Sequence, residues 1–289
     1  MKKIFNIMVL LILSCSVLLG QRDSEVIKKS LKVNDSSKEF WFAVCNINGN
    51  VDVEAYNGNT IEIELKKQIS ARSNADVKTG MEEVKMLISE GDDFAKVNFE
   101  FPDQQIREKD DPLDCGWDWN GKRRRSKYSY KLDYKVRVPE GISVKISTVN
   151  DGDVSIKNVN GEVYAGNVNG DITLENIQSN TKASTVNGVI EASYTKMPTE
   201  FASFSTVNGD ILISAPDRSN ATFNFQSQWG KVYSDFDFDS KVAPKVMKTS
   251  SGRGTMYKIS NSNGYQIGEG GPSFEFETLN GDIRISKKK

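Results

Sequence analysis

The chain has 289 residues, no histidine and nearly balanced charge, with 38 Lys and Arg residues against 39 Asp and Glu residues. The lack of imidazole excludes Ser-His-Asp and Cys-His catalysis, the usual zinc sites and a histidine pH switch. A formal charge of −1 gives no electrostatic basis for nucleic-acid binding, and 37% hydrophobic residues with 27% charged residues are typical of a folded globular chain.

The first twenty residues have the pattern of a secretory signal peptide. Lys2 and Lys3 precede an apolar run from Ile4 to Gly20. The run is short for a membrane span, so we expect cleavage at its end and export of a chain, residues 21–289, without a transmembrane segment. A lipid anchor at Cys15 is the competing prediction, because residues 12–14 loosely resemble a lipobox, but the apolar stretch continues beyond Cys15.

Cleavage would leave Cys45 and Cys115 as an even pair of cysteines in an exported chain. Oxidation is permitted outside the cytosol, so we expect a single disulfide between them. Closing such a 70-residue loop would stabilise the fold by roughly 4 kcal/mol in the chain-entropy model. Two buried free thiols are the alternative.

Residues 21–138 form a less regular part that alternates predicted strands with one predicted helix. Val77, Met81, Val84 and Ile88 repeat at helical spacing, which predicts a helix over residues 76–89 with Asn74 or Asp76 as its cap. Alternating apolar residues predict strands at Phe40–Val44, Val51–Tyr56, Ile61–Leu65, Phe94–Phe101 and Tyr128–Val138.

Residues 102–127 are predicted to be a long polar loop. The loop carries aspartates, then Trp117, Asp118 and Trp119, then a basic run that includes Arg123, Arg124 and Arg125. Internal pairing and solvation of these charges is the simplest interpretation. The functional hypothesis is a ligand-binding loop, in which the two tryptophans stack on sugar rings while Asp118 and the arginines bind hydroxyls or acidic groups.

The dipeptide Asn-Gly occurs nine times, where composition alone (24 Asn and 22 Gly in 289 residues) predicts about two. Asn-Gly favours turns with positive φ, and the excess therefore indicates repeated turns. A short strand with period-two alternation follows several of them, as in Asp171–Leu174 and Asp210–Ile213. The predicted structural turns are Asn160–Gly161, Asn169–Gly170, Asn187–Gly188, Asn208–Gly209 and Asn280–Gly281.

The turns recur at a period that predicts a β-solenoid over residues 139–289. Ser-Thr-Val-Asn-Gly appears whole at 184–188 and 205–209, and further glycines at 230 and 252 continue the spacing of about twenty-one residues. Such a repeat is typical of coils whose strands stack in columns. An antiparallel hairpin meander, giving a β-sandwich or barrel, is the alternative, because Asn-Gly is also the strongest hairpin signal.

The string Tyr134–Ile146, with its Val138-Pro139-Glu140-Gly141 junction, and the Asn-Gly-Asp repeats after it resemble the putative-adhesin family of bacterial envelope proteins, a family of unknown function related to head-GIN domain proteins. The resemblance covers roughly residues 40–289. It implies a right-handed parallel β-helix exported to the periplasm or the cell surface, and it brings no catalytic residues. The charged loop 102–127 is not part of the family pattern.

Two other patterns have simple structural interpretations. Asp235, Asp237 and Asp239 alternate with Phe236 and Phe238, so the phenylalanines are expected to face the core and the carboxylates the solvent, rather than to form a cation or glycosidase site. The Asn-Gly-Asp turns lack the Gly-Gly pair of calcium-binding β-rolls, so we expect the asparagines to stack as hydrogen-bonding ladders.

The sequence therefore predicts an exported, non-enzymatic β-helix that serves as an adhesin-like interaction or structural surface at the cell envelope. No cofactor, metal or nucleic acid is expected, and the partner would be an envelope protein or a glycan. The alternative is a polysaccharide-binding or polysaccharide-degrading β-helix, for which carboxylates would have to cluster beside a cleft.

Overall fold

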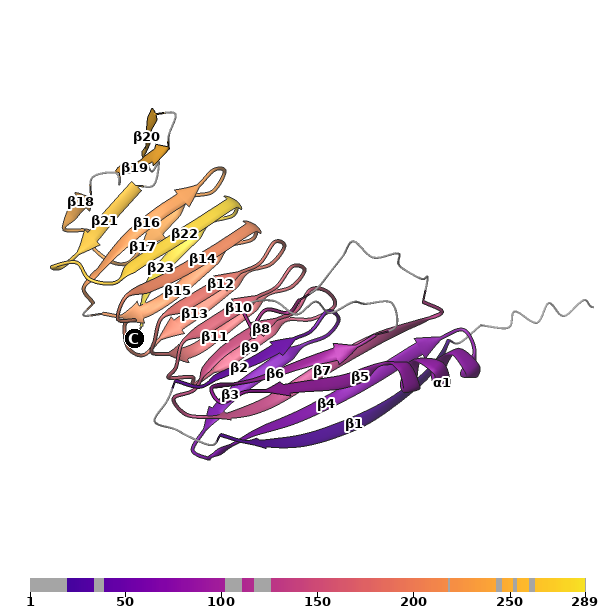
Figure 1. The fold of residues 1–289 in the computed structure, drawn as a ribbon. Helices are drawn as coiled ribbons and strands as arrows, with labels where there is room; N and C mark the ends of the chain where they lie inside the picture. Colours follow the sequence, from indigo (N-terminus) through magenta and orange to yellow (C-terminus); the bar gives the residue numbers. More distant parts are fainter. Residues whose placement is uncertain are drawn as a thin grey trace, which may run out of the picture.

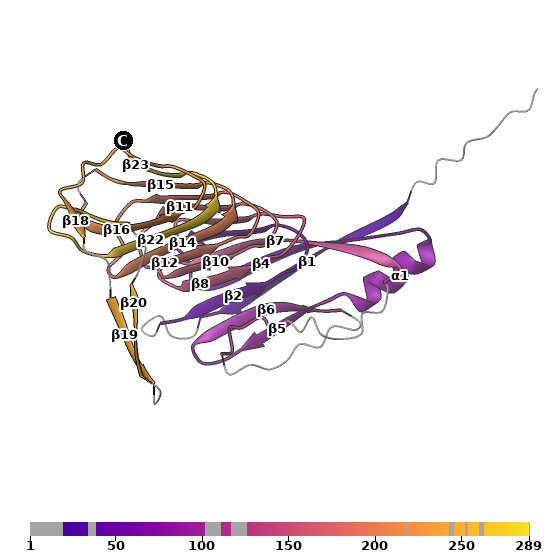
Figure 2. The same ribbon diagram turned by 90° about the horizontal axis from the view of Figure 1, so that it is seen from above.

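The computed structural model of the chain describes residues 20–33, 39–101, 111–116, 126–217, 219–242, 246–251, 254–259 and 263–288. These residues form two large mixed sheets, one separate hairpin and one α-helix (Figure 1). The fold is therefore all-β apart from the helix, and the two sheets face each other across one continuous apolar core (Figure 2).

Sheet A consists of ten strands in the described residues. In spatial order they are β1 (Gln21–Lys32), β4 (Thr60–Ala71), β7 (Tyr128–Pro139), β3 (Val51–Tyr56), β9 (Val154–Lys157), β11 (Ile172–Ile177), β13 (Ile190–Tyr194), β15 (Ile211–Pro216), β23 (Ile283–Lys288) and β17 (Val232–Ser234).

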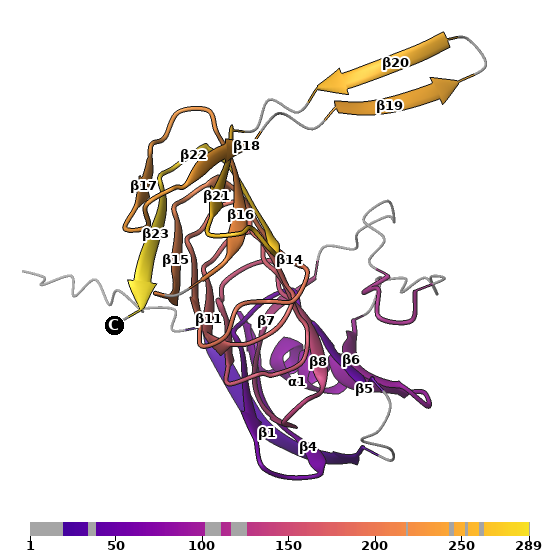
Figure 3. The same cartoon turned by 90° about the vertical axis from the view of Figure 1, so that its left-hand side faces the viewer.

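Sheet B consists of eleven strands in the same described ranges. In spatial order they are β18 (Ser240–Val242), β21 (Asn263–Ile267), β16 (Ala221–Ser227), β22 (Ser273–Asn280), β14 (Phe201–Asn208), β12 (Thr181–Ser184), β10 (Val163–Gly166), β8 (Ser143–Ser147), β2 (Trp41–Cys45), β6 (Phe94–Glu100) and β5 (Lys85–Glu90). The hairpin of β19 (Val246–Ser251) and β20 (Gly254–Ile259) projects away from both sheets (Figure 3).

Each strand of the central part of sheet B continues, through a turn, into a strand of sheet A, and the two together form one rung of a solenoid-like stack (Figure 1). Neighbouring rungs pair in parallel, as where Ile172 lies opposite Ile190 and Ala183 opposite Phe204. A hairpin meander would pair these strands antiparallel, so the observed pairing favours the solenoid over the sandwich. The rungs stack in the order β2–β3, β8–β9, β10–β11, β12–β13, β14–β15, β22–β23 and β16–β17.

The stacking order departs from the chain order at the C-terminal end. The glycine spacing predicts that Gly230 follows Gly209 in the stack, and this prediction was wrong. The last rung of the chain, β22–β23, lies between β14–β15 and β16–β17, so Gly281 packs against Gly209, and Gly230 packs against Gly281. Gly252, the next predicted turn, lies outside the described residues.

The core between the sheets is built from columns of equivalent side chains. On sheet B, one column consists of Ala183 followed in the next rungs by the stacked rings of Phe204, Phe276 and Phe225. The ring centroids of Phe204 and Phe276 are 5.6 Å apart, and those of Phe276 and Phe225 are 5.2 Å apart. Burying an aliphatic or aromatic side chain of this size contributes about 1.5–3 kcal/mol of transfer free energy. The corresponding column on sheet A is fully buried and consists of Val51, Val154, Ile172, Ile190, Ile211 and Ile283.

Helix α1 (Asn74–Glu83) packs on the inner side of the long strands β1, β4 and β7. Its N-cap is Ser73, whose hydroxyl accepts a hydrogen bond from the Asp76 amide at 3.1 Å, so the predicted caps, Asn74 and Asp76, were wrong. At its other end the buried Lys67 donates to the carbonyls of Met81 and Val84 at 2.8 and 2.9 Å. No helix in the described part of the chain is long and apolar enough to cross a membrane.

The predicted extension of the helix to residue 89 was wrong. Val84 already has extended backbone, and Lys85–Glu90 form β5, which pairs antiparallel with β6. Met86 and Ile88 are half-buried and alternate with exposed residues, which is the period of two expected for a strand. The spacing of Val84 and Ile88 alone also fits one face of a helix, so the local pattern is compatible with both structures. Pairing with β6 satisfies the backbone of this segment and decides between the two.

Candidate interaction surfaces

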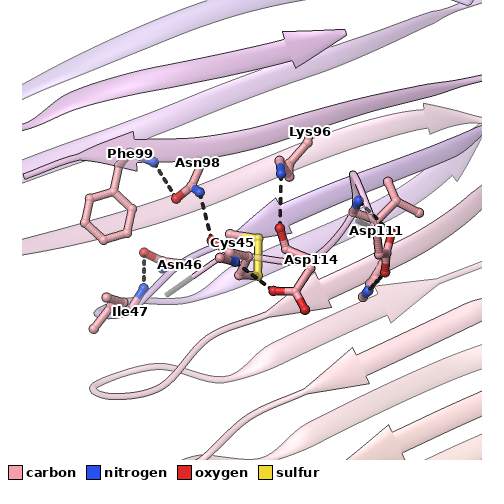
Figure 4. Close-up of a disulfide and its surroundings, with 12 residues drawn as sticks. Cys45, Asn46, Ile47, Lys96, Asn98, Phe99, Asp111 and Asp114 are labelled. Atoms are coloured by element: carbon pink, nitrogen blue, oxygen red, sulfur yellow. Dashed lines mark hydrogen bonds and ion pairs between the residues drawn. A yellow bond between two sulfur atoms is a disulfide. The ribbon is translucent and has the colours of Figure 1, made fainter. Parts of the chain in front are cut away.

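A disulfide joins Cys45 on β2 to Cys115, which confirms the predicted pairing (Figure 4). The two Cα atoms are 5.5 Å apart, and 70 residues separate the cysteines in sequence. Cys45 is buried although it lies on the outer side of sheet B, because the segment that carries Cys115 covers it.

The segment Asp111–Gly116 lies on sheet B through contacts to β6 and β8 (Figure 4). Lys96 donates to the Asp114 carbonyl at 3.0 Å, and Lys145 forms an ion pair with the Asp111 carboxylate at 2.8 Å. The hydrogen bond from Lys145 lowers the pKa of Asp111, while partial burial lowers the pKa of Lys96. One covalent and several polar contacts therefore fix this segment to the sheet.

The predicted ligand-binding residues follow directly after the fixed segment. Trp117, Asp118, Trp119, Arg123, Arg124 and Arg125 lie outside the described residues. The structure places Gly116, the residue before them, beside the disulfide.

Two aromatic residues that the sequence analysis did not single out lie on the same outer side of sheet B. The rings of Trp41 and Tyr164 are 5.0 Å apart and half-buried. Tyr164 is opposite Lys145 in the strand register, so this pair is next to the Asp111–Lys145 contact. Each ring reaches a carboxylate, since Trp41 donates to Glu39 at 3.1 Å and Tyr164 to Glu162 at 3.1 Å. The sequence could have indicated Trp41, because it alternates with the apolar residues Phe40 and Phe42 and is therefore expected on the outer face of the strand.

A groove of about 880 Å³ lies on the outer face of sheet A over β1, β4, β7, β3 and β9. Acidic and basic residues alternate across its strands, as the ion pairs Lys28–Glu64 at 2.8 Å and Arg137–Glu62 at 2.9 Å show. Each such cross-strand ion pair contributes little to the free energy of folding, but together the pairs favour one register between the strands. Within the groove, desolvation raises the pKa of Asp52.

A ladder of asparagine side chains runs along the turns that connect sheet B to sheet A. Each amide nitrogen donates to the amide oxygen of the preceding rung at 2.8 Å. The members of this Asn ladder, in stacking order, are Asn150, Asn169, Asn187, Asn208 and Asn280. The predicted turn Asn160–Gly161 is not part of it, because this pair joins β9 to β10 at the opposite edge of the stack.

The residues around the ladder explain the repeated Thr-Val-Asn-Gly-Asp pattern. The threonine hydroxyl donates to the glycine carbonyl of the preceding rung, as from Thr206 to Gly188 at 3.1 Å. The aspartate accepts the backbone N–H of the next rung, as Asp210 does from Asp282 at 2.8 Å. These carboxylates therefore bind backbone amides. In the described part of the chain, no group of three or more Asp, Glu or Cys residues is placed to hold a metal ion.

The rung β16–β17 ends the ladder with a different turn. Trp229 takes the place of the asparagine, and its backbone N–H donates to the Leu279 carbonyl at 3.1 Å. Its side chain is 76% exposed. A second groove, of about 740 Å³, lies beside this turn and is lined in part by Val207, Gln228 and Leu279.

The aspartates of the 235–239 segment are exposed, whereas Phe236 is buried and Phe238 packs against the core, as the simple interpretation expects. The segment is not a strand. Asp239 accepts the Gly268 backbone N–H, so this carboxylate has a structural contact.

Comparison with known proteins places most of the chain in one family. Residues 21–265 match the family described as Toastrack DUF4097. No curated protein matches the chain. Among solved structures, a "putative cell adhesion protein" from Clostridium sporogenes is 13% identical, with 93% of this chain and 100% of that chain covered and a TM-score of 0.43. A "putative adhesin" from Bacteroides fragilis is 13% identical, with 91% and 97% covered and a TM-score of 0.33.

Proposed function

The chain belongs to the Toastrack DUF4097 family, and from this premise we propose that it is an exported, non-enzymatic protein that provides an adhesin-like interaction or structural surface at the bacterial cell envelope. The proposal includes a signal peptide over residues 1–20 and a single domain over residues 21–289. It also includes the winding of the rungs as a right-handed parallel β-helix. The continuous core supports the single domain, and the parallel pairs between rungs support a parallel β-helix.

The observation that carries the proposal is the disulfide-fixed segment on sheet B. A disulfide persists in oxidising compartments, which supports export. The contacts of Lys96 and Lys145 hold the segment Asp111–Gly116 against sheet B, so the proposed binding residues begin directly after a fixed point of the chain. Binding residues on a loop that a rigid scaffold positions are a common arrangement in proteins.

Cell fractionation and capture test this function. We expect the intact chain in the periplasmic or surface fraction, and crosslinking should capture an envelope protein or glycan. The double variant Trp117→Ala with Trp119→Ala should lose at least about tenfold in affinity for the captured partner, because stacked aromatics commonly dominate such contacts. Trp229→Ala is the matched control, since Trp229 is exposed at the far end of the stack. A cytosolic location would contradict export, and unchanged binding by the double variant would contradict a binding site at Trp117 and Trp119.

A polysaccharide-degrading function is the second candidate, and the groove on sheet A supports it. Asp52 and Glu54 are successive outward residues of β3, so their Cα atoms are roughly 6.6–7 Å apart. Carboxyl groups carried on Cα atoms at this spacing can reach the separation of roughly 6.5–9.5 Å that inverting glycosidases use, in which one carboxyl has a raised pKa. Desolvation raises the pKa of Asp52, which is the direction required of the carboxyl that acts as the general acid.

Release of reducing ends from uronate and neutral glycans tests the second candidate. Turnover that Asp52→Asn abolishes would establish an enzyme and contradict the non-enzymatic proposal. Ser155→Ala, at the position opposite Asp52 in the neighbouring strand, is the control for damage to the groove.

A further inference from the structure

The asparagine-glycine pairs of this chain differ in their exposure to a spontaneous chemical modification. In an Asn-Gly sequence the glycine backbone nitrogen can attack the side-chain carbonyl carbon of the asparagine. A carbon–nitrogen bond forms, ammonia leaves and a succinimide results, which water opens to aspartate or isoaspartate. The reaction needs a free glycine N–H and an asparagine amide that can turn toward it.

Three ladder asparagines meet neither requirement. After Asn169, Asn187 and Asn208, the glycine N–H donates to the backbone carbonyl of the next rung at 3.0 Å in each case. Both amide atoms of each side chain are also held, since the nitrogen donates to one neighbouring asparagine and the oxygen accepts from the other. Cyclisation at these residues must first break three hydrogen bonds.

Asn160 meets both requirements. It is exposed in the connection between β9 and β10, away from the ladder. Neither its side-chain amide nor the Gly161 N–H has a hydrogen-bond partner among the described residues.

Asn280 is the last ladder member and is held on one side only. Its amide nitrogen donates to Asn208 at 2.8 Å. The next rung offers Trp229 instead of an asparagine, so within the described ranges neither the Asn280 amide oxygen nor the Gly281 N–H has a hydrogen-bond partner.

We propose that deamidation of the folded protein takes place at Asn160 and Asn280, and that the ladder protects Asn169, Asn187 and Asn208. The reaction at Asn280 has a structural consequence. Aspartate or isoaspartate there has no amide nitrogen to donate to Asn208. Isoaspartate also adds a methylene to the backbone directly before Gly281. There is no room for extra atoms at Gly281, because a Cβ added to this residue would lie 1.9 Å from the Gly209 carbonyl oxygen. The modification would therefore loosen the rung β22–β23.

Peptide mapping by mass spectrometry after incubation at mildly alkaline pH tests this proposal. Native protein and protein unfolded in urea are incubated in parallel, and aspartate and isoaspartate are quantified at all five asparagines. In the native protein we expect Asn160 and Asn280 to react at least roughly tenfold faster than the three ladder residues, because each hydrogen bond that must open lowers the rate. In urea the five rates should converge, since all five precede glycine.

The matched comparison is Asn208 against Asn280, which share the dipeptide and the ladder and differ in the rung that follows. The proposal is overturned if either Asn160 or Asn280 reacts no faster than the ladder residues in the native protein. It is also overturned if the differences persist in urea, because they would then come from local sequence. The proposed envelope function does not enter either outcome.

Discussion

The middle rungs and the outer rungs of the stack are held together in different ways. From β8 to β15 each rung follows the previous one directly in sequence, with separations of 19, 18 and 21 residues between successive ladder asparagines. The outer rungs come from distant sequence. β2–β3 stacks on β8–β9 across 102 residues, as between Trp41 and Ser143, and Asn280 reaches Asn208 across 72 residues. The N-terminal rung has a disulfide at Cys45, whereas the C-terminal rung β22–β23 contains no cysteine and is held by noncovalent contacts of the ladder, the strands, the core and the Lys287–Asp217 ion pair.

This difference follows from the entropy of bringing segments together. Consecutive rungs close short loops, so ladder hydrogen bonds and columns of side chains are enough to hold them. A rung that returns from a distant segment closes a longer loop, and the disulfide removes part of that entropy from the unfolded chain. The following changes test this contrast, from the largest expected effect to the smallest.

Cys45→Ser with Cys115→Ser should have the largest effect. Loss of the 70-residue cross-link lowers the free energy of unfolding by roughly 4 kcal/mol in the chain-entropy model. Denaturant unfolding measures the loss, and hydrogen exchange should locate it in β2, β3 and β6 rather than in β10–β13. Uniform loss of protection across the middle rungs would contradict the contrast.

Gly209→Ala should destabilise the middle rungs by about 3 kcal/mol, because a Cβ would lie 1.9 Å from the Gly188 carbonyl oxygen and backbone must move. Gly166→Ala is the matched control. The nearest atom to a Cβ there is Ser147 Oγ at 3.5 Å, and a change within about 1 kcal/mol is expected. Thermal unfolding of both variants checks the difference, and equal losses would show that close packing of the turns is not the cause.

Asn208→Ala should cost about 1–2 kcal/mol, since it removes two ladder hydrogen bonds, one to Asn187 and one from Asn280. Asn280→Ala removes one and should cost about half as much. Chemical denaturation compares the two variants. A larger loss for Asn280→Ala would mean that the end of the ladder, and not its interior, holds the stack.

Trp229→Asn with Lys231→Asp should restore the ladder pattern in the terminal rung. Asparagine at 229 can donate to Asn280, and a gain of about 0.5–1 kcal/mol is expected in thermal unfolding. The restored end should also associate with other copies, because atypical terminal repeats are what keeps solenoid ends apart. Sedimentation measures the association, and Trp229→Ala, which restores nothing, is the control.

Lys145→Met should have the smallest effect, below about 0.5 kcal/mol, because the Asp111 side chain of this ion pair is 53% exposed. The pair lowers the pKa of Asp111, so its contribution is present above the ordinary aspartate pKa of 3.8 and is lost as the pH falls through the lowered value. The stability difference between wild type and variant should therefore vanish in acid. A difference that persists there would assign it to packing.

The stacking order could have been read in part from the residues around the turns. Thr278-Leu279-Asn280-Gly281-Asp282 contains every ladder position, whereas Ser227-Gln228-Trp229-Gly230-Lys231 replaces the asparagine and the aspartate. The turn with Trp229 can stack on a rung that carries the ladder, but at the ladder position it has no side-chain amide to which another rung could donate. Counting glycines alone hid this distinction, and it led to the wrong neighbour for Gly209.

The sequence by itself determined many of the strands, the Asn-Gly turns and the repeat, because short-range rules govern them: Asn-Gly pairs favour turns and alternating apolar residues favour half-buried strands. It did not predict β1 (Gln21–Lys32). It also identified the two cysteines that pair. Tertiary structure alone decided that the segment after Val84 is a strand, that Ser73 caps the helix and that β22–β23 enters the stack before β16–β17. Each of these depends on a partner distant in sequence, whose hydrogen bonds and buried surface outweigh the local preference.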